Sequence, residues 1–279
     1  MPTGGGFTVI VLSYDRPRAL RVLLQGLSTQ QLGGADMELI VCNNAAGVRL
    51  AASPWTATGR LLRRFPDVKI MNSSHNWLCR VRYPLTTLAR HDTIVFIDDD
   101  VVITDPHFLR YMYDAFATVR PIDVLSCWTA LWTEWNDEHL KKVRMNFADP
   151  APSEMTECDY AGPGLCIFDR RILIESGLLA LAPELHRSDS TWFPWLTAMK
   201  LGTRKYYLPS HGRVTFHEEF TRHALTPSPG FRSEMYATYK KMWTRGYVPV
   251  LARKRAEPDF EHSREAVAAR TLPVETDRW

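Results

Sequence analysis

The sequence predicts an α/β protein whose mostly parallel central sheet carries helices on both faces. The run Phe7 to Ser13 is continuously apolar and rich in Val and Ile, which is typical of a strand covered on both sides. Strand-like and helix-like patterns then alternate along the chain, which favours a parallel sheet. Polar residues follow the ends of these predicted strands, where such sheets bind ligands.

The first helix is predicted directly after the first strand. Asp15 stands at the expected N-cap, Pro17 suits the first helical position, and leucines recur at helical spacing up to Leu27. Short apolar runs predict the other strands, and apolar residues at helical spacing predict the other helices. We expect strands at 38–42, 68–71, 93–97, 124–128, 165–168, 205–208 and 213–217, and helices at 79–89, 108–116, 170–176, 190–201 and 233–245.

Two regions do not follow this alternation. Residues 131–158 are irregular and polar, and they predict either a long functional loop or an inserted hairpin. Residues 251–279 are charged and interrupted by proline, which predicts a loosely attached tail.

Composition excludes several classes of protein. The formal net charge of +3 is small for 279 residues and does not indicate a nucleic-acid partner. The start has no secretory pattern and no apolar stretch reaches about 18 residues, so we expect a cytoplasmic protein without a membrane span, with peripheral membrane association left open. The five cysteines form no Cys-x-x-Cys pair, which argues against a zinc ribbon; we expect mostly buried thiols and leave one disulfide open. The oligomeric state is left open.

Three consecutive aspartates, Asp98-Asp99-Asp100, close the predicted strand Thr93 to Ile97. Several carboxylates at one strand end concentrate negative charge, and such a concentration requires a cation. The triplet therefore predicts a divalent-metal site, the alternative being a solvated acidic turn.

The order of several motifs resembles that of GT-A glycosyltransferases over about residues 7 to 220. The motifs are Ser13-Tyr14-Asp15-Arg16-Pro17, Asn43-Asn44, Ile97-Asp98-Asp99-Asp100, the glycine-bearing segment at Gly162-Pro163-Gly164, and Val214-Thr215-Phe216-His217. The sequence is similar to the broad family 2, and also to the exostosin-like family 64 through Arg80-x-Arg82, Asn43-Asn44 and the triple aspartate.

This resemblance implies a metal-dependent glycosyltransferase. It would move a hexosyl or N-acetylhexosaminyl group from a nucleoside diphosphate sugar, with UDP favoured, to a saccharide or other hydroxyl acceptor, using Mn²⁺ or Mg²⁺. Residues 1–250 would form one GT-A catalytic domain, with a nucleotide-sugar half at 7–128 and an acceptor half at 129–250 that forms a smaller subregion. The alternatives are a catalytically silent binding module and, less favoured, a nucleotidyltransferase, because Ser13 to Arg16 replaces the Gly-rich loop of that class.

The resemblance also assigns the metal ligands. Asp100 would bind the metal directly, and Asp98 would bind the ribose or the metal through a water. Asp99 is a further candidate for donor contacts, unless its side chain points elsewhere. His217 would complete the coordination, since a neutral imidazole is a good manganese ligand; the alternative is an ordinary surface histidine.

Other residues would bind the donor. Arg16, Arg80 and Arg82 are candidates for the diphosphate; Arg80 and Arg82 would diverge by roughly 200° on one helix, so only one of them is expected to reach a given phosphate. The resemblance to the exostosin-like family favours Arg82, by its distance from the aspartates. Tyr14 and Asn43, with Asn44 and Asn76 as alternates, are candidates for the base and ribose. Gly162 and Gly164 would allow the backbone to approach the donor sugar, unless they only form a turn.

The catalytic base is the least determined residue. Asp189 precedes a predicted helix at the place where inverting members carry an acidic pair, so it is the candidate base, with a plain N-cap as the alternative. Inversion and retention both stay open. Trp128, Trp132 and Trp135 would form an acceptor platform or belong to the core, and Asp159 and Tyr160 would touch substrate hydroxyls.

Overall fold

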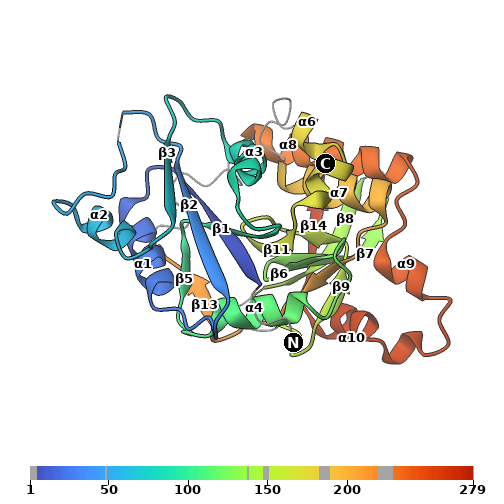
Figure 1. Ribbon diagram of the computed structural model, residues 1–279. Coiled ribbons are helices and arrows are strands. Elements are labelled where there is room, and N and C mark those ends of the chain that lie inside the picture. Colours follow the sequence, from blue (N-terminus) through green and yellow to red (C-terminus); the bar gives the residue numbers. More distant parts are fainter. Residues whose placement is uncertain are drawn as a thin grey trace.

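An eight-stranded mixed sheet forms the centre of the molecule in the computed structural model, which describes residues 5–47, 49–136, 138–146, 151–181, 189–218 and 229–278 (Figure 1). In sheet order the strands are β3 (Val68–Asn72), β2 (Asp36–Asn43), β1 (Gly6–Ser13), β4 (Thr93–Asp98), β11 (Leu165–Asp169), β6 (Val124–Ser126), β12 (Lys205–Tyr207) and β9 (Thr156–Cys158). Strands β3, β2, β1 and β4 are parallel, as are β6 and β12, whereas β11 and β9 run antiparallel to their neighbours. The predicted fold class is confirmed.

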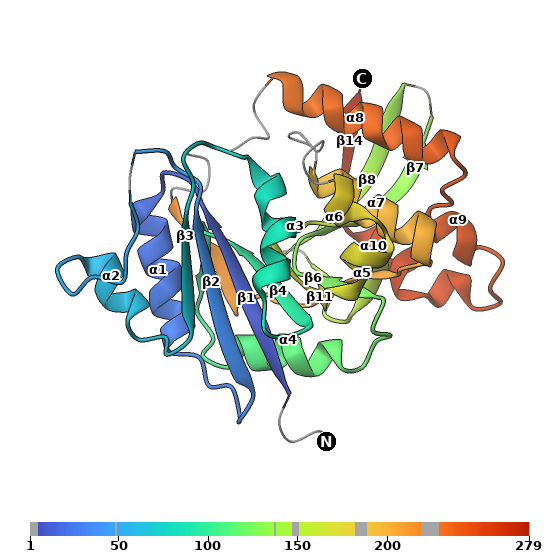
Figure 2. The ribbon, with the colours of Figure 1, turned by 45° about the horizontal axis from the view of Figure 1, so that its top comes forward.

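Helices cover both faces of this sheet because its strands alternate between two cores. On β1, Val9 and Val11 contribute to one core and Ile10 to the other. The first core lies under α1 (Pro17–Ser28) and α4 (Phe108–Phe116). The second lies under α3 (Arg82–Leu85), α5 (Arg171–Glu175), α6 (Leu178–Leu181), α7 (Asp189–Leu201) and α8 (Pro229–Thr244). Figure 2 shows α1 and α3 on opposite sides of β1 and β2.

Three predictions about the helices differ from the structure. Arg16, not Asp15, is the N-cap of α1, because Asp15 lies in the left-handed region with φ 52°. The helix predicted for residues 79–89 is broken into η1 (Cys79–Val81), α3 and η2 (Thr86–Leu88). Pro84 lies within this stretch and has no N–H to donate, which accounts for the break. A short helix that the sequence did not predict, α2 (Ala57–Leu62), begins after the N-cap Thr56.

A second, four-stranded antiparallel sheet confirms the hairpin alternative for residues 131–158. Its strands are β10 (Tyr160–Ala161), β7 (Thr129–Trp135), β8 (His139–Met145) and β14 (Val274–Arg278). A third element, the ribbon of β5 (Val101–Ile103) and β13 (Val214–Phe216), packs beside α1. The ribbon joins the aspartates at the end of β4 to the region of His217.

The expectation of a loose tail from residue 251 is wrong. Residues 250–278 form α9 (Val250–Lys254), η5 (Phe260–His262), α10 (Arg264–Thr271) and β14, which pairs with β8. Val250, Leu251 and Leu272 are buried in a core shared with β7 and β8. The charges that suggested a tail are paired: Lys254 lies 3.0 Å from Glu265. The division into a donor half and an acceptor half stays a prediction.

Asp159 connects this C-terminal part to the hairpin. Its side chain is fully buried and accepts hydrogen bonds from the Trp132 N–H (2.7 Å), the Val250 N–H (2.8 Å) and the Tyr247 hydroxyl (2.9 Å). Burial raises the pKa of Asp159 to about 6, although these hydrogen bonds act to lower it. The expectation that Asp159 touches substrate is therefore wrong, because the carboxylate is enclosed and used by the fold.

The expectation of mostly buried thiols is confirmed. All five cysteines are free thiols, and four are buried. Within the ranges given above, no helix is long and apolar enough to span a membrane.

Candidate functional site

The polar residues predicted at the strand ends lie at one edge of the central sheet. In the register of β1 with its neighbours, Ser13 lies beside Asn43 of β2, and Leu12 lies beside Asp98 of β4. Asp98 is the last residue of β4, and Asp99 and Asp100 form the turn that leads into β5. The aspartates, the asparagines and the β1–α1 loop therefore share one edge.

Arg16 binds two of the three aspartates. Its Nη1 donates to Asp99 Oδ1 (3.0 Å) and to Asp100 Oδ2 (2.6 Å), while Asp99 Oδ2 accepts from the Tyr14 N–H (3.1 Å). Asp99 is only 3% exposed, so it fastens the β1–α1 loop to the end of β4. The expectation that Asp99 contacts the donor thus gives way to the alternative that its side chain points elsewhere.

The aspartates carry more negative charge than Arg16 neutralises. Burial raises the pKa of Asp99 to about 6, although Arg16 opposes the shift. Burial and the neighbouring charge of Asp98 raise the pKa of Asp100 to about 7. A cluster whose carboxylates resist ionisation binds an additional cation favourably.

Arg82 is buried and pairs with Asp98. It is 4% exposed, and its guanidinium donates to Asp98 Oδ1 (2.9 Å), the Pro163 carbonyl (2.7 Å) and the Cys79 carbonyl (3.2 Å). The guanidinium therefore joins three segments of the chain. These bonds to protein oxygens favour a positioning role for Arg82, and its expected contact with the diphosphate stays a prediction.

Gly164 lies against the other oxygen of Asp98. A Cβ at this position would lie 2.5 Å from Asp98 Oδ2, and the Asp98 N–H donates to the Gly164 carbonyl (2.7 Å). The glycine is thus needed for a close approach, as the sequence predicted, but to the aspartate. Gly162 is buried against Trp128, with its N–H bonded to the Trp128 carbonyl (2.7 Å), so its role in the structure is packing.

The asparagines hold the loop that follows β3. Asn43 Nδ2 donates to Asn72 Oδ1 (3.1 Å), and Asn44, which is 1% exposed, donates to Asn76 Oδ1 (2.8 Å). Asn44 Oδ1 also accepts from the Trp77 N–H (3.0 Å). Asn43 is 7% exposed, so little of its amide faces the edge, whereas Asn76 and Tyr14 are exposed there.

Sequence reasoning missed Trp77 in this loop. Its ring is 40% exposed, lies 4.0 Å from the His75 ring, and has the Arg80 guanidinium over it at 5.5 Å. Leu78, which follows, has φ 59°; with Asp15 it is one of two non-glycine residues of positive φ in the described chain, and both border this edge. Such strain is concentrated at functional sites. A tryptophan in a polar segment after a strand was the available signal.

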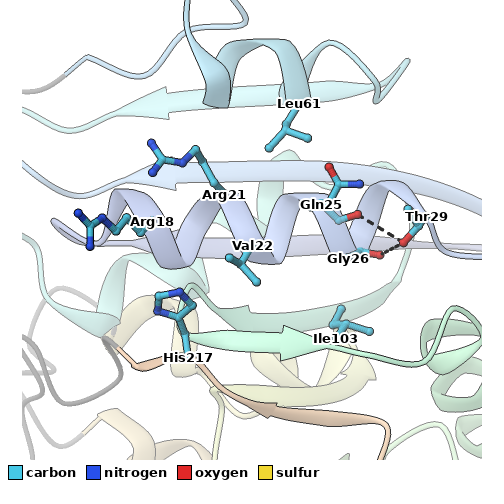
Figure 3. A pocket seen from close by; sticks show the side chains of 9 residues that line it. All are labelled: Arg18, Arg21, Val22, Gln25, Gly26, Thr29, Leu61, Ile103 and His217. Atoms are coloured by element: carbon cyan, nitrogen blue, oxygen red, sulfur yellow. Dashed lines mark hydrogen bonds between the residues drawn. The ribbon is translucent and has the colours of Figure 1, made fainter.

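The backbone of His217 lies next to the aspartates. Its N–H donates to the Asp100 carbonyl (2.8 Å), whereas its ring lines a groove of about 610 Å³ along α1, with Arg18 and Val22 (Figure 3). Within the described ranges, no three His, Cys, Asp or Glu side chains are grouped to hold a metal ion. The structure therefore places His217 beside the cluster without joining its ring to it.

The cluster nevertheless fits a divalent metal in charge and donor type. Three carboxylates face two guanidinium groups, those of Arg16 and Arg82, which leaves a negative excess. Carboxylate oxygens are the donors that Mg²⁺ and Mn²⁺ prefer, and such sites use one or two carboxylates with substrate phosphates and waters. Asp98 and Asp100 are the residues that would hold the metal.

The residues predicted to face the acceptor lie only partly within the described structure. Asp189 is the first residue of α7, but its side chain lies outside the described structure, as do Arg187 and Ser188. Trp132 is 2% exposed and belongs to the core, whereas Trp128 is half-buried and packs edge-on against Phe216, with ring centroids 4.9 Å apart.

Comparison with known proteins identifies a family over residues 8–177. The family model described as Glycosyl transferase family 2 matches residues 8–177. No curated protein matches the chain. The crystal structure of S. aureus TarS is similar with a TM-score of 0.55 and 14% identity, covering 92% of this chain and 41% of that chain.

The crystal structure of S. aureus TarS 1-349 gives a TM-score of 0.53 at 14% identity, covering 92% of this chain and 68% of that chain. At this identity the likeness concerns the fold alone, and the chain spans only 41% of the length of the first TarS chain. The likeness to exostosin-like proteins stays a prediction.

Proposed function

The chain belongs to glycosyl transferase family 2, and from this premise we propose that it transfers a sugar from a nucleoside diphosphate, preferably UDP, to a hydroxyl of a saccharide acceptor. We propose that the reaction requires Mn²⁺ or Mg²⁺. The observation that carries the proposal is the cluster of Asp98, Asp99 and Asp100 at the end of β4, where burial and mutual repulsion raise the pKa values of Asp99 and Asp100. The sugar type and the acceptor are part of the same proposal.

The residues at this edge of the sheet have separate roles in binding a diphosphate donor. A bound divalent cation would neutralise the charge of the departing diphosphate. Asp98 and Asp100 supply oxygen donors, and Arg82 and Gly164 fix the orientation of Asp98. Trp77, exposed next to Asn76 in the loop after β3, offers a face on which a nucleobase can stack.

Arg16 has a second role in this proposal. Its guanidinium holds Asp99 and Asp100 in place when no metal ion neutralises their charge. If Asp100 held the metal through Oδ2, the oxygen that Arg16 binds, Arg16 would release that oxygen and could keep its bond to Asp99. A released guanidinium donor beside a diphosphate can bind phosphate oxygens, as expected for Arg16 from the sequence.

The proposal is tested by thermal-shift measurements with nucleoside diphosphates and their sugars, each with and without Mn²⁺. We expect UDP and a UDP-sugar to raise the melting temperature only when Mn²⁺ is present, because binding to the folded state stabilises it. Mn²⁺-dependent release of UDP from the same sugar nucleotide is the matching activity. Donor binding without any release of UDP would instead favour a catalytically silent module, and no binding of any nucleotide would contradict the proposal.

We further propose Asp189 as the general base that removes the proton of the acceptor hydroxyl. It stands at the start of α7, and an inverting transfer needs a carboxylate in that role. We expect Asp189→Asn to lower the transfer rate by about 100-fold and to leave UDP affinity with Mn²⁺ unchanged. Steady-state kinetics with calorimetric titration of UDP separate the two quantities. Full activity in the variant would exclude Asp189 from catalysis.

A further inference from the structure

One outer face of the molecule is basic and contains no acidic residue. It is formed by α1, the segment before α2, and α2 with the residues that follow it, and we refer to it as the α1–α2 face. Residues 16–35 and 45–66 contain no Asp or Glu. Six arginines lie on this face, five of them exposed and Arg21 half-buried: Arg18, Arg21, Arg49, Arg60, Arg63 and Arg64.

These six arginines are not ion-paired within the described part of the chain. Arg60 donates to the Pro54 carbonyl (3.2 Å), and Arg64 donates to Gln25 Oε1 (3.2 Å). Arginines elsewhere pair with carboxylates, for example Arg110 with Asp114 at 2.7 Å. The positive charge of the α1–α2 face is therefore uncompensated, although the chain as a whole carries only +3.

Exposed apolar side chains accompany this charge. Trp55, in the segment before α2, is 89% exposed, and Val22 of α1 is 37% exposed. Val22 lines the groove along α1 together with Leu61 and Ile103, and Arg18 and Arg21 project from the same helix (Figure 3). Both ribbon views place α2 and its preceding segment at one edge of the molecule (Figure 1). A large aromatic side chain so exposed gains free energy only when a partner buries it.

We propose that the α1–α2 face docks the protein on an anionic lipid surface. The arginines bind lipid phosphates, and Trp55 lies at the headgroup level, where tryptophan is enriched in membrane proteins. A nucleic acid or an acidic peptide would account for the arginines alone. The combination of an unpaired basic surface with a projecting, fully accessible tryptophan fits the boundary between charged headgroups and acyl chains. This inference goes beyond the proposed glycosyl transfer and does not depend on it.

The test is flotation of the full chain with phosphatidylcholine vesicles and with vesicles that also contain phosphatidylglycerol. We expect binding only to the anionic vesicles, and weaker binding at high salt because exposed charges are screened. The triple variant Arg60→Gln, Arg63→Gln, Arg64→Gln is expected to weaken binding by about 100-fold at low salt. Trp55→Ala is expected to weaken it by about tenfold.

Matched controls remove the same charge and the same ring elsewhere. Lys240, Lys241 and Arg255 are exposed on or next to α8 and α9, at the other end of the molecule, so their triple replacement by glutamine is expected to leave binding unchanged. Trp243, which is 42% exposed on α8, gives the matching Trp243→Ala control. Melting temperatures equal to that of the parent protein establish that each variant is folded.

Three outcomes would overturn the inference. The first is the absence of binding to anionic vesicles at low salt. The second is an equal loss in the control triple variant, which would show that total charge, not the α1–α2 face, governs binding. The third is binding of a short DNA duplex or of polyglutamate as tight as vesicle binding and insensitive to Trp55→Ala, which would identify a soluble polyanion as the occupant.

Discussion

We expect the Asp100→Ala variant to lose about 10³-fold in transfer rate and to bind UDP with the same affinity whether or not Mn²⁺ is present. A bound metal contributes several kcal/mol of charge stabilisation, and Asp100 is the aspartate that the family resemblance assigns to direct ligation. Calorimetric titration of UDP with and without Mn²⁺ measures the affinity for UDP. Release of UDP from the sugar nucleotide measures the rate.

The fold is expected to survive this substitution. Asp100 is 9% exposed, and burial with repulsion by Asp98 raises its pKa to about 7, so its charged form is costly in the folded state. Arg16 keeps its hydrogen bond to Asp99 when Asp100 is absent. Asp114→Ala, which removes an exposed carboxylate on α4, is the charge-matched control. A variant at Asp100 that still responds to Mn²⁺ as the parent protein does would refute the assignment.

The edge of the sheet was predictable because its signals are local. The apolar run of β1, the helical leucines of α1 and the polar residues after each strand are all read within a few positions of sequence. A parallel sheet then brings the strand ends together without further information, which is why Asp98 and Asn43 were expected on one edge and lie there.

The C-terminal segment was not predictable in the same way because its partners are distant in sequence. Strand β14 pairs with β8, so Asp277 lies beside Leu140 and forms an ion pair with Lys142. Read alone, residues 251–279 show charge and proline. Burial of Leu272 and the pairing of Lys254 with Glu265 become visible only when the hairpin of β7 and β8 is in place.

The role of an arginine near the site is similarly hidden. Arg80 and Arg82 are close in sequence, yet Arg80 lies over the exposed ring of Trp77, whereas Arg82 is buried and bonded to protein oxygens. Arg80 lies in the 3₁₀ turn η1, whereas Arg82 is the first residue of α3, so the spacing of one regular α-helix does not apply to the pair. The resemblance favoured Arg82 for the donor, whereas the structure gives Arg80 the more open position, over the exposed ring of Trp77.

Arg82→Ala is expected to cost about 3 kcal/mol of unfolding free energy and to weaken donor binding through Asp98. The substitution leaves the Pro163 carbonyl without its guanidinium donor and Asp98 without its partner, whereas the Cys79 carbonyl keeps the bond from the backbone N–H of position 82. We place the loss at the lower end for a buried ion pair because the Asp98 side chain is 37% exposed and water can solvate it. Urea unfolding measures the stability, with Arg110→Ala as a more exposed control, half-buried on α4, expected to cost less than about 1 kcal/mol.

A second variant separates the position of Asp98 from the charge of Arg82. In Gly164→Ala both charges remain, but the new Cβ would lie 2.5 Å from Asp98 Oδ2 and must displace that carboxylate. We expect it to cost about 1–3 kcal/mol and to weaken Mn²⁺-dependent UDP binding as well. If Arg82→Ala alone weakened UDP binding, the guanidinium itself would contact the donor. If both variants weaken it, Arg82 acts by holding Asp98 and the adjoining Pro163-Gly164 segment, because these are the features that both substitutions disturb.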